Sequence, residues 1–251
     1  MARFSRVLIA NRTEIAARII RTLDDMGIGS VAVFSDADAD LPFVHDADMA
    51  IRLPGTAPAD TYLNVDAIIT AAKTTGADAV HPGYGFLAEN AAFATRCADE
   101  GLTFIGPSPA AIASMGSKIE AKRLVREAGV PLLDDIDLSD PDAVPYPVLV
   151  KASAGGGGRG MRIVRSAEEL EAGMESARLE AANAFGDDTI FVERWLEKVR
   201  HIEVQVIGDT HGNITHLFER ECSIQRRHQK VVEEAPSAAI SQEMRDRLTS
   251  A

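Results

Sequence analysis

The stretch that decides the fold is residues 6–34, RVLIANRTEIAARIIRTLDDMGIGSVAVF. Residues 6–10 form an unbroken apolar run of the kind found in fully buried strands. Residues 15–23 then carry apolar side chains at helical spacing, and Gly27 is typical of the residue that ends a helix. A second apolar run follows at residues 30–34. The sequence therefore predicts a strand–helix–strand unit with its two strands parallel.

The start of the first predicted helix carries a further signal. Asn11 follows the first strand directly, and Glu14 stands three residues later. This spacing is typical of a capping box, in which two side chains each accept a hydrogen bond from a backbone N–H at the helix start. We therefore expect Asn11 to cap this helix.

The same alternation continues to about residue 115. Asn64 predicts the start of a helix that ends at Gly76, and residues 77–81 form the next strand-like run. A third helix is expected from about residue 90 to residue 101, before a short strand at residues 102–105. Strands that alternate with helices predict an α/β fold, a doubly wound parallel sheet with helices on both faces.

Residues 81–86, HPGYGF, follow one of these strands. Ligands of doubly wound sheets bind beyond the carboxyl ends of the strands, so this segment is a candidate binding site. Gly83 and Gly85 are equally typical of a tight turn. Composition leaves both interpretations open.

The pattern changes after residue 115. Alternation of Ile202, Val204 and Val206 favours an antiparallel sheet with one face in water. The elements expected in this region are helices at residues 118–128 and 166–183, and strands near residues 147–151, 161–164, 189–193, 201–207 and 213–219. The sequence therefore predicts an α+β region behind the α/β region.

A glycine run, AGGGGRG at residues 154–160, lies between two of these strands. It contains a formal GxGxxG match, which would suggest an NAD-dependent oxidoreductase, but that motif needs a helix directly after the glycines. A hairpin flap is favoured instead, because backbone N–H groups of glycines can close over a triphosphate and Lys151 stands at its mouth. The alternative is a flexible surface hairpin.

Polar residues gather further along the chain. His201, Glu203 and Gln205 share one face of a predicted strand, and residues 219–230 read ERECSIQRRHQK. One interpretation of this basic cluster is a solvated loop, or a small nucleic-acid patch. The other is a cationic pocket for phosphate and a small oxyanion, with carboxylates that order the cations. Composition does not decide between them.

The overall charge narrows the function classes. The formal net charge of −12 argues against a nucleic-acid partner. Cys97 and Cys222 form neither a disulfide framework nor a CxxC zinc pair. No apolar stretch of membrane-spanning length and no signal-peptide core is present, so we expect no membrane association and a cytoplasmic location.

Taken together, several runs resemble the biotin carboxylase family. They are IANR at residues 9–12, HPGYGFLAEN at residues 81–90, residues 151–161, residues 200–206, and most specifically ERECSIQRRHQKVVEEAP at residues 219–236. The resemblance implies an amino-terminal α/β domain at residues 1–115 and an incomplete ATP-grasp domain at residues 116–251. It also implies a mobile lid that carries the glycine loop, at about residues 130–195.

The resemblance further implies a reaction. MgATP phosphorylates bicarbonate, and the carboxyphosphate formed carboxylates biotin on a biotin carboxyl carrier domain. A carboxyltransferase subunit would be a further partner and would decide the final acceptor. A homodimer is expected, with Arg18 at its interface.

Individual roles follow from the same resemblance. Lys230 is expected to contact bicarbonate and, with His201, to be catalytic. Tyr84 and Gly85 are expected to border the ureido ring of biotin. The residues expected to bind ATP are Lys118, Lys151, Gly155, Gly156, Gly157, Gly158, Glu193, Leu196, His201, Gln225 and His228, with Glu193 and Leu196 acting through their backbones.

The sequence also departs from the family pattern. Thr13 stands where a glycine is usual, Ser117 replaces the usual aspartate, and residues 131–146 form a shorter segment than usual. The Mg²⁺ ligands, the catalytic base and an arginine for biotin's enolate would come from a later segment. Since the sequence stops within a helix expected from Ser241, we expect an amino-terminal fragment that does not carboxylate biotin alone. A non-catalytic ATP-binding fragment is the alternative.

Overall fold

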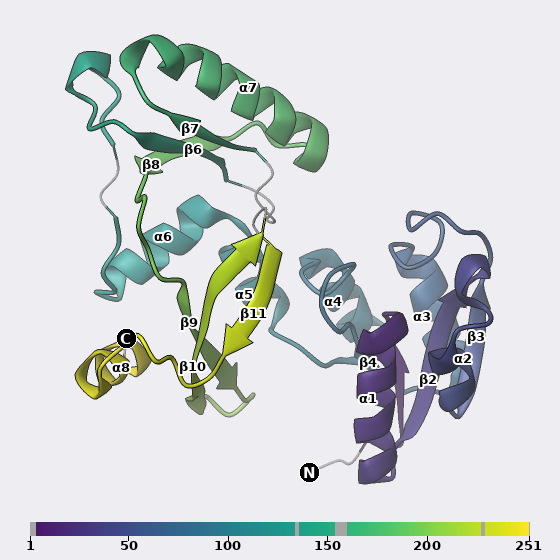
Figure 1. The fold of residues 1–251 in the computed structure, drawn as a ribbon. Coiled ribbons are helices and arrows are strands. Elements are labelled where there is room, and N and C mark those ends of the chain that lie inside the picture. The colour runs from purple at the N-terminus through teal and green to yellow at the C-terminus, as the bar shows by residue number, and fades with distance from the viewer. Residues whose placement is uncertain (1–3, 134–135, 154–159, 227–228, 251) are drawn as a thin grey trace. The chain divides into compact units, whose positions relative to one another are not determined.

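The computed structural model describes residues 4–133, 136–153, 160–226 and 229–250 (Figure 1). The chain divides into two compact units, Met1–Gly116 and Ser117–Ala251. Each unit has its own sheet structure and its own buried core. Among the described residues, no helix is long and apolar enough to cross a membrane.

The first unit is built on a five-stranded parallel sheet of order β3-β2-β1-β4-β5. Its strands are β1 (Arg6–Ile9), β2 (Gly29–Ser35), β3 (Met49–Leu53), β4 (Ala79–His81) and β5 (Thr103–Phe104). Its helices are α1 (Thr13–Met26), α2 (Pro42–Asp46), α3 (Val65–Thr75), α4 (Ala91–Asp99) and α5 (Pro109–Gly116), with a 3₁₀ turn at Asp36–Asp38.

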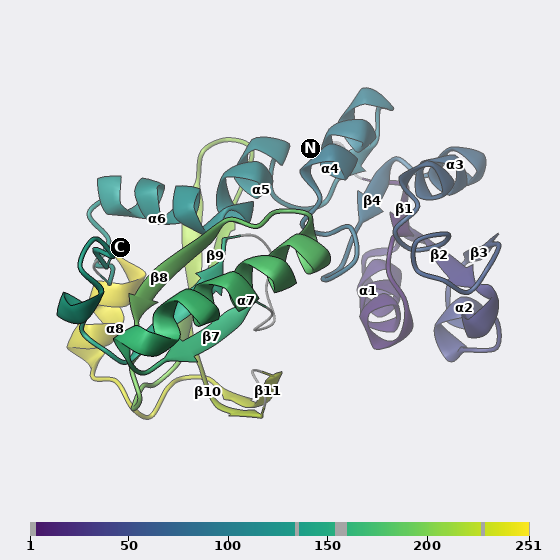
Figure 2. The same cartoon turned by 90° about the horizontal axis from the view of Figure 1, so that it is seen from above.

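Alternate side chains of β1 enter the two cores on opposite faces of this sheet. Val7 and Ile9 pack with side chains of α1 and α2, whereas Leu8 packs with side chains of α3 and α4. Figure 2 shows α1 and α2 on one side of the sheet and α3 on the other. The predicted doubly wound sheet is therefore confirmed.

The predicted capping box of α1 is wrong. The cap residue is Arg12, which makes no side-chain cap bond, and the Thr13 hydroxyl donates to the Glu14 carboxylate. Asn11 is fully buried, and its amide donates to the carbonyl oxygens of Pro82 and Tyr84, both at 2.8 Å. These two carbonyls need hydrogen-bond donors, so the Asn11 side chain binds the loop after β4 and does not cap the helix. The predicted Asn64 cap of α3 is confirmed.

The second unit contains two antiparallel three-stranded sheets. The first, of order β7-β6-β8, consists of β6 (Val148–Ala152), β7 (Met161–Val164) and β8 (Ile190–Arg194), and its core includes side chains of α7 (Ala167–Phe185). The second, of order β11-β10-β9, consists of β9 (Ile202–Gly208), β10 (Ile214–Arg226) and β11 (Gln229–Glu234). Helices α6 (Lys118–Glu127) and α8 (Gln242–Thr249) and a 3₁₀ turn at Pro141–Ala143 complete the unit.

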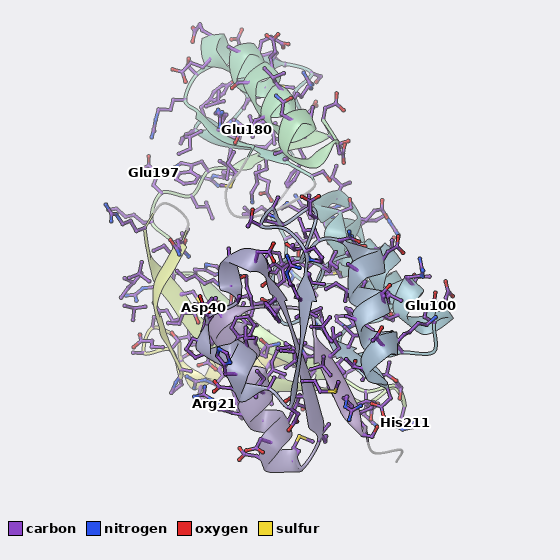
Figure 3. All side chains as sticks on the ribbon, turned by 90° about the vertical axis from the view of Figure 1, so that its right-hand side faces the viewer. Arg21, Asp40, Glu100, Glu180, Glu197 and His211 are labelled. Carbon is purple, nitrogen blue, oxygen red and sulfur yellow. The ribbon has the colours of Figure 1, made fainter. Side chains whose placement is uncertain are left out.

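Most predicted elements of the second unit are present. Figure 3 labels Glu180 on α7, which pairs with Arg162 of β7 at 2.7 Å and ties the helix to the sheet. The described part of the basic run at residues 219–230, which could have been a loop, instead forms the end of β10 and the start of β11. The predicted antiparallel pairing of β9 is confirmed, although Val206, one of its alternating apolar residues, is 57% exposed. The proposed extent of a lid stays a prediction.

A buried carboxylate joins the loops at the carboxyl end of the parallel sheet. Asp38 accepts hydrogen bonds from Arg12 Nε at 2.8 Å, Ser35 Oγ at 2.9 Å and Tyr62 Oη at 2.6 Å. The hydrogen bonds from Arg12 outweigh burial and lower the pKa of Asp38 to about 2. Burial, reinforced by the Asp38 contact, raises the pKa of Tyr62 to about 12. The Tyr62 ring also stacks on Phe86 at 5.1 Å, which supports the loop after β4.

Replacing Asp38 tests this network. Since its folded pKa lies below the ordinary value of 3.8, its contribution to stability is present above that value and is lost as the pH falls toward 2. Asp38→Asn should therefore lower the free energy of unfolding by roughly 2 kcal/mol at pH 7. The difference from the parent chain should shrink between pH 5 and pH 2. Urea unfolding followed by circular dichroism measures both.

A matched control is Asp40→Asn, which removes the same charge from an exposed position nearby (Figure 3). It should leave the free energy of unfolding almost unchanged at every pH. A loss for Asp38→Asn that is equally large at pH 2 and pH 7 would show that the ionised carboxylate is not its cause.

Candidate functional site

The two strands that flank the glycine run in the sequence are adjacent and antiparallel, as the hairpin interpretation predicts. Strands β6 and β7 pair antiparallel, with Lys151 opposite Met161, and the Ala152 N–H donates to the Gly160 carbonyl at 3.0 Å. A strand follows the glycines, so the helix that a dinucleotide-binding GxGxxG motif requires is not formed there. The predicted phosphate contacts Gly155, Gly156, Gly157 and Gly158 lie outside the described residues.

Lys151 is held by a carboxylate at the mouth of this hairpin. Its Nζ lies 2.7 Å from Glu193 Oε2 on the neighbouring strand β8, and Lys122 Nζ of α6 lies 3.4 Å from the other oxygen, Oε1. Both ammonium groups lie over the Phe191 ring, at 5.9 Å for Lys151 and 5.4 Å for Lys122. We call Lys122, Lys151 and Glu193 the hairpin cluster.

Lys118 reaches the same hairpin from the start of α6. Its backbone N–H and its Nζ both donate to the Ser153 carbonyl, at 3.2 and 3.3 Å. Ser117, the departure from the family pattern, caps the helix by accepting from the Glu120 N–H at 3.4 Å. Ser153 directly precedes the glycine run, so the structure brings Lys118 and Lys151 to the start of the hairpin loop.

A second group of polar side chains crosses the sheet β9–β10–β11. Gln225 Nε2 lies 2.8 Å from His201 Nδ1, and Lys230 Nζ lies 2.6 Å from Glu203 Oε2. Arg220 Nε donates to Glu203 Oε1 at 2.8 Å, and His201 Nε2 lies 3.8 Å from Glu203 Oε2. These five residues form the sheet cluster. The antiparallel register explains it, since Arg220 pairs with Glu203 and Lys230 with Gln225.

Glu203 is the electrostatic centre of the sheet cluster. Its partial burial alone would raise its pKa, but the hydrogen bonds and charges of Lys230 and Arg220 lower the pKa to about 2. In turn, the hydrogen bond to Glu203 raises the pKa of Lys230. Both side chains are therefore charged at neutral pH. A fixed ammonium group beside a carboxylate can present further N–H donors to a small oxyanion.

Tyr84 and Gly85 lie in the loop after β4, in the first unit. Tyr84 is 65% exposed, and Gly85 has a φ of +73°. The loop follows β4 next to the end of β1, between the two halves of the sheet, which is the switch point where doubly wound sheets bind ligands. A side chain at Gly83 would place its Cβ 2.6 Å from Ile15 and 2.7 Å from the Asn11 amide. The loop is therefore held tightly against α1.

Comparison with known proteins gives the family. The model of the biotin carboxylase N-terminal domain matches residues 3–112, and that of the carbamoyl-phosphate synthase L chain ATP-binding domain matches residues 117–251. The chain is 50% identical to biotin carboxylase 2 of Bacillus subtilis over 98% of this chain and 57% of that protein. It is also 50% identical to the biotin carboxylase of Haemophilus influenzae, over 96% of this chain and 56% of that protein.

The chain belongs to the biotin carboxylase family. A biotin carboxylase–β,γ-ATP complex from Campylobacter jejuni matches its fold with a TM-score of 0.94 at 45% identity, over 99% of this chain and 58% of that one. A second match is the biotin carboxylase domain of 2-oxoglutarate carboxylase from Hydrogenobacter thermophilus, solved with MgADP, ADP and bicarbonate. It gives a TM-score of 0.93 at 47% identity, over 100% of this chain and 57% of that one. The chain spans little more than half the length of these curated relatives.

The expected site residues of this biotin carboxylase relative fall into three places. The hairpin cluster and Lys118 form one, the sheet cluster with His201, Gln225 and Lys230 the second, and the loop of Tyr84 and Gly85 the third. Leu196 follows β8 and is 40% exposed, and His228 lies outside the described residues. The roles assigned to all of these site residues stay predictions.

The sequence did not single out two cluster members, Lys122 and Arg220, or the ring of Phe191 beside the hairpin cluster. Lys122 could have been found, because its spacing of four from Lys118 places both lysines on one face of a helix. Arg220 belongs to the basic run at residues 219–230, but nothing in that run distinguishes it from its neighbours. Arg220 reaches Glu203 only through the β9–β10 register, and Phe191 reads as an ordinary strand residue.

Magnesium is implied by the family, but the described residues do not fit it. Within the described ranges, no three histidine, cysteine, aspartate or glutamate side chains gather around a common point. The carboxylates of the two clusters are instead occupied by lysine and arginine. The carboxylates of these two clusters therefore act as partners of the cations and not as ligands of a metal ion.

The link between Glu203 and Lys230 can be measured directly. Glu203→Gln removes the hydrogen bond that raises the Lys230 pKa, so this pKa should fall toward the ordinary lysine value. The pH dependence of Lys230 acylation, followed by mass spectrometry, reports this pKa. Glu233→Gln, which removes a more distant carboxylate on β11, should produce a smaller shift. Equal shifts in the two variants would contradict a direct contact.

Proposed function

We propose that this chain supplies the ATP-phosphate, bicarbonate and biotin contacts of a biotin carboxylase, an ATP-dependent ligase that forms a C–N bond. A bicarbonate oxygen attacks the γ-phosphorus of ATP, carboxyphosphate forms and ADP leaves. A ring nitrogen of carrier-bound biotin then takes the carboxyl group, the C–O bond to the phosphate breaks, and the phosphate leaves with the proton of that nitrogen. The support is the family membership, together with relatives solved with an ATP complex and with MgADP and bicarbonate.

The observation that carries this proposal is the sheet cluster. Lys230 lies on β11 and His201 directly precedes β9, and both lie beside Glu203, within 2.6 and 3.8 Å. The carboxylate orients the Lys230 ammonium, whose remaining N–H donors can hold a bicarbonate oxygen. The His201 ring is hydrogen-bonded to Gln225, which would hold it in position near the nucleotide.

The ATP phosphates would bind at the hairpin. Lys118 and Lys151 supply two ammonium groups at its start, and charge-assisted contacts to phosphate are among the stronger polar interactions. The glycine loop, with Gly155–Gly158, would close above them, while backbone groups of Glu193 and Leu196 meet adenine. Mg²⁺ would accompany ATP and neutralise phosphate charge.

Biotin and the partner proteins would use the first unit. Tyr84 and Gly85 would border the ureido ring, because their loop is exposed at the switch point of the parallel sheet. The biotin would arrive on a carboxyl carrier domain and leave for a carboxyltransferase subunit. Arg18 on α1 would lie at a homodimer interface.

Replacing Lys230 separates the bicarbonate role from a general electrostatic one. In a chain of the length of its relatives, Lys230→Gln should raise the KM for bicarbonate by about tenfold or more and change the KM for ATP much less. The reason is that the variant loses one charge-assisted contact to bicarbonate. Steady-state kinetics with ADP release as the signal measures both constants.

Arg226→Gln is the matched control, because Arg226 is a neighbouring basic residue of β10 with an exposed side chain. It should leave the KM for bicarbonate close to that of the parent enzyme. Equal increases in both KM values for Lys230→Gln would move Lys230 to a general electrostatic role.

A further inference from the structure

Glu193 pairs with two lysines at once in the hairpin cluster. Its side chain is 13% exposed, and each carboxylate oxygen faces a different lysine, Lys151 from the same sheet and Lys122 from α6. Lys122 is 14% exposed and Lys151 is 28% exposed, so water covers little of this group. The three charges are therefore coupled, and a change at one of them alters the other two.

A nucleotide would compete with Glu193 for Lys151. When the Lys151 ammonium turns to a phosphate oxygen, its 2.7 Å contact with Glu193 Oε2 is weakened or lost. A carboxylate of low exposure that loses its only counterion is costly, because desolvation is no longer compensated. With Lys151 as its sole partner, Glu193 would thus oppose the binding of ATP.

Lys122 removes that cost. We propose that Lys122 is a positioning residue for ATP binding: it keeps Glu193 neutralised while Lys151 exchanges this carboxylate for the phosphates. This inference rests on the proposed function, in which Lys151 contacts ATP. Lys122 itself touches no phosphate and acts through Glu193.

The position of Phe191 supports the exchange. The centroid of its ring lies 5.4 Å from Lys122 Nζ and 5.9 Å from Lys151 Nζ, so the two lysines share an aromatic ring as well as a carboxylate. Two ammonium groups that share these partners also repel each other. The repulsion favours the release of Lys151, the less buried of the two, toward an added anion.

The test is calorimetric binding of a non-hydrolysable ATP analogue and of adenosine to the 251-residue chain and its variants. Lys122→Met should weaken binding of the ATP analogue by about tenfold and leave adenosine binding unchanged, since only the phosphates use Lys151. Lys122→Arg should retain most of the affinity. Adding Glu193→Gln to Lys122→Met should restore binding of the ATP analogue, because the competing carboxylate has lost its charge.

Arg123→Met provides the matched control. It removes the same charge one residue along α6, where Arg123 is 52% exposed and pairs with Glu120 and Glu127. This variant should bind the ATP analogue like the parent chain. Thermal unfolding of every variant shows whether the fold is retained.

Two results separate the inference from the proposed function. Binding that is abolished by Lys151→Ala but unchanged by Lys122→Met would overturn the role of Lys122 alone. Binding of the ATP analogue that is absent in the parent chain, or unaffected by Lys151→Ala, would overturn the proposed ATP contact and this inference with it. Failure of Glu193→Gln to restore binding in the Lys122→Met background would also overturn the inference.

Discussion

Ion pairs between carboxylates of low exposure and basic side chains on neighbouring strands or helices hold the second unit and its candidate site in place. Glu203 joins β9 to Arg220 of β10 and to Lys230 of β11, and so crosses the whole sheet. Glu193 of β8 likewise pairs with Lys122 of α6 and with Lys151 of β6. Because each cation is fixed by its carboxylate, these lysines occupy defined positions before any anion binds.

Ion pairs with buried carboxylates also link the elements around the site. Glu219 is fully buried at its side chain and accepts from Arg245 Nε at 2.8 Å, which ties α8 to β10. Glu221 pairs with Arg200 at 2.6 Å just before β9. An ion pair whose carboxylate is buried contributes little net stability, but removing its cation leaves a buried charge without a partner, so the pair favours one arrangement of the strands over others. This arrangement is what an anion-binding surface requires.

The first unit was the more predictable half of the fold. Apolar runs and helical spacing in residues 6–34 specify two buried strands and the helix between them, because the hydrophobic pattern is continuous there. Strand β3 was missed, since it is short and only Leu53 of its five residues is buried. Asn11 was misjudged because its burial depends on the loop after β4, which is 71 residues away along the chain.

The second unit shows why a site is harder to predict than a fold. Strand β11 reads QKVVEE and is exposed along its length, so it gives no hydrophobic signal. Its pairing with β10 is nevertheless what brings Lys230 to Glu203. Motif resemblance named His201, Gln225 and Lys230, and the strand pattern placed Glu203 on the same face as His201, but the contacts of Glu203 with Lys230 and Arg220, and of Lys122 with Glu193, depend on strand register and distances.

The most direct test of this account is a lysine footprint of the 251-residue chain. Acetylation rates of individual lysines would be measured by mass spectrometry with and without a non-hydrolysable ATP analogue. Lys151 should be acetylated more slowly when the analogue is bound, and the rate at Lys198, which is exposed outside both clusters, should be unchanged. Equal protection of both lysines, or no protection of Lys151 at saturating analogue, would contradict the claim that the hairpin cluster receives the nucleotide phosphates.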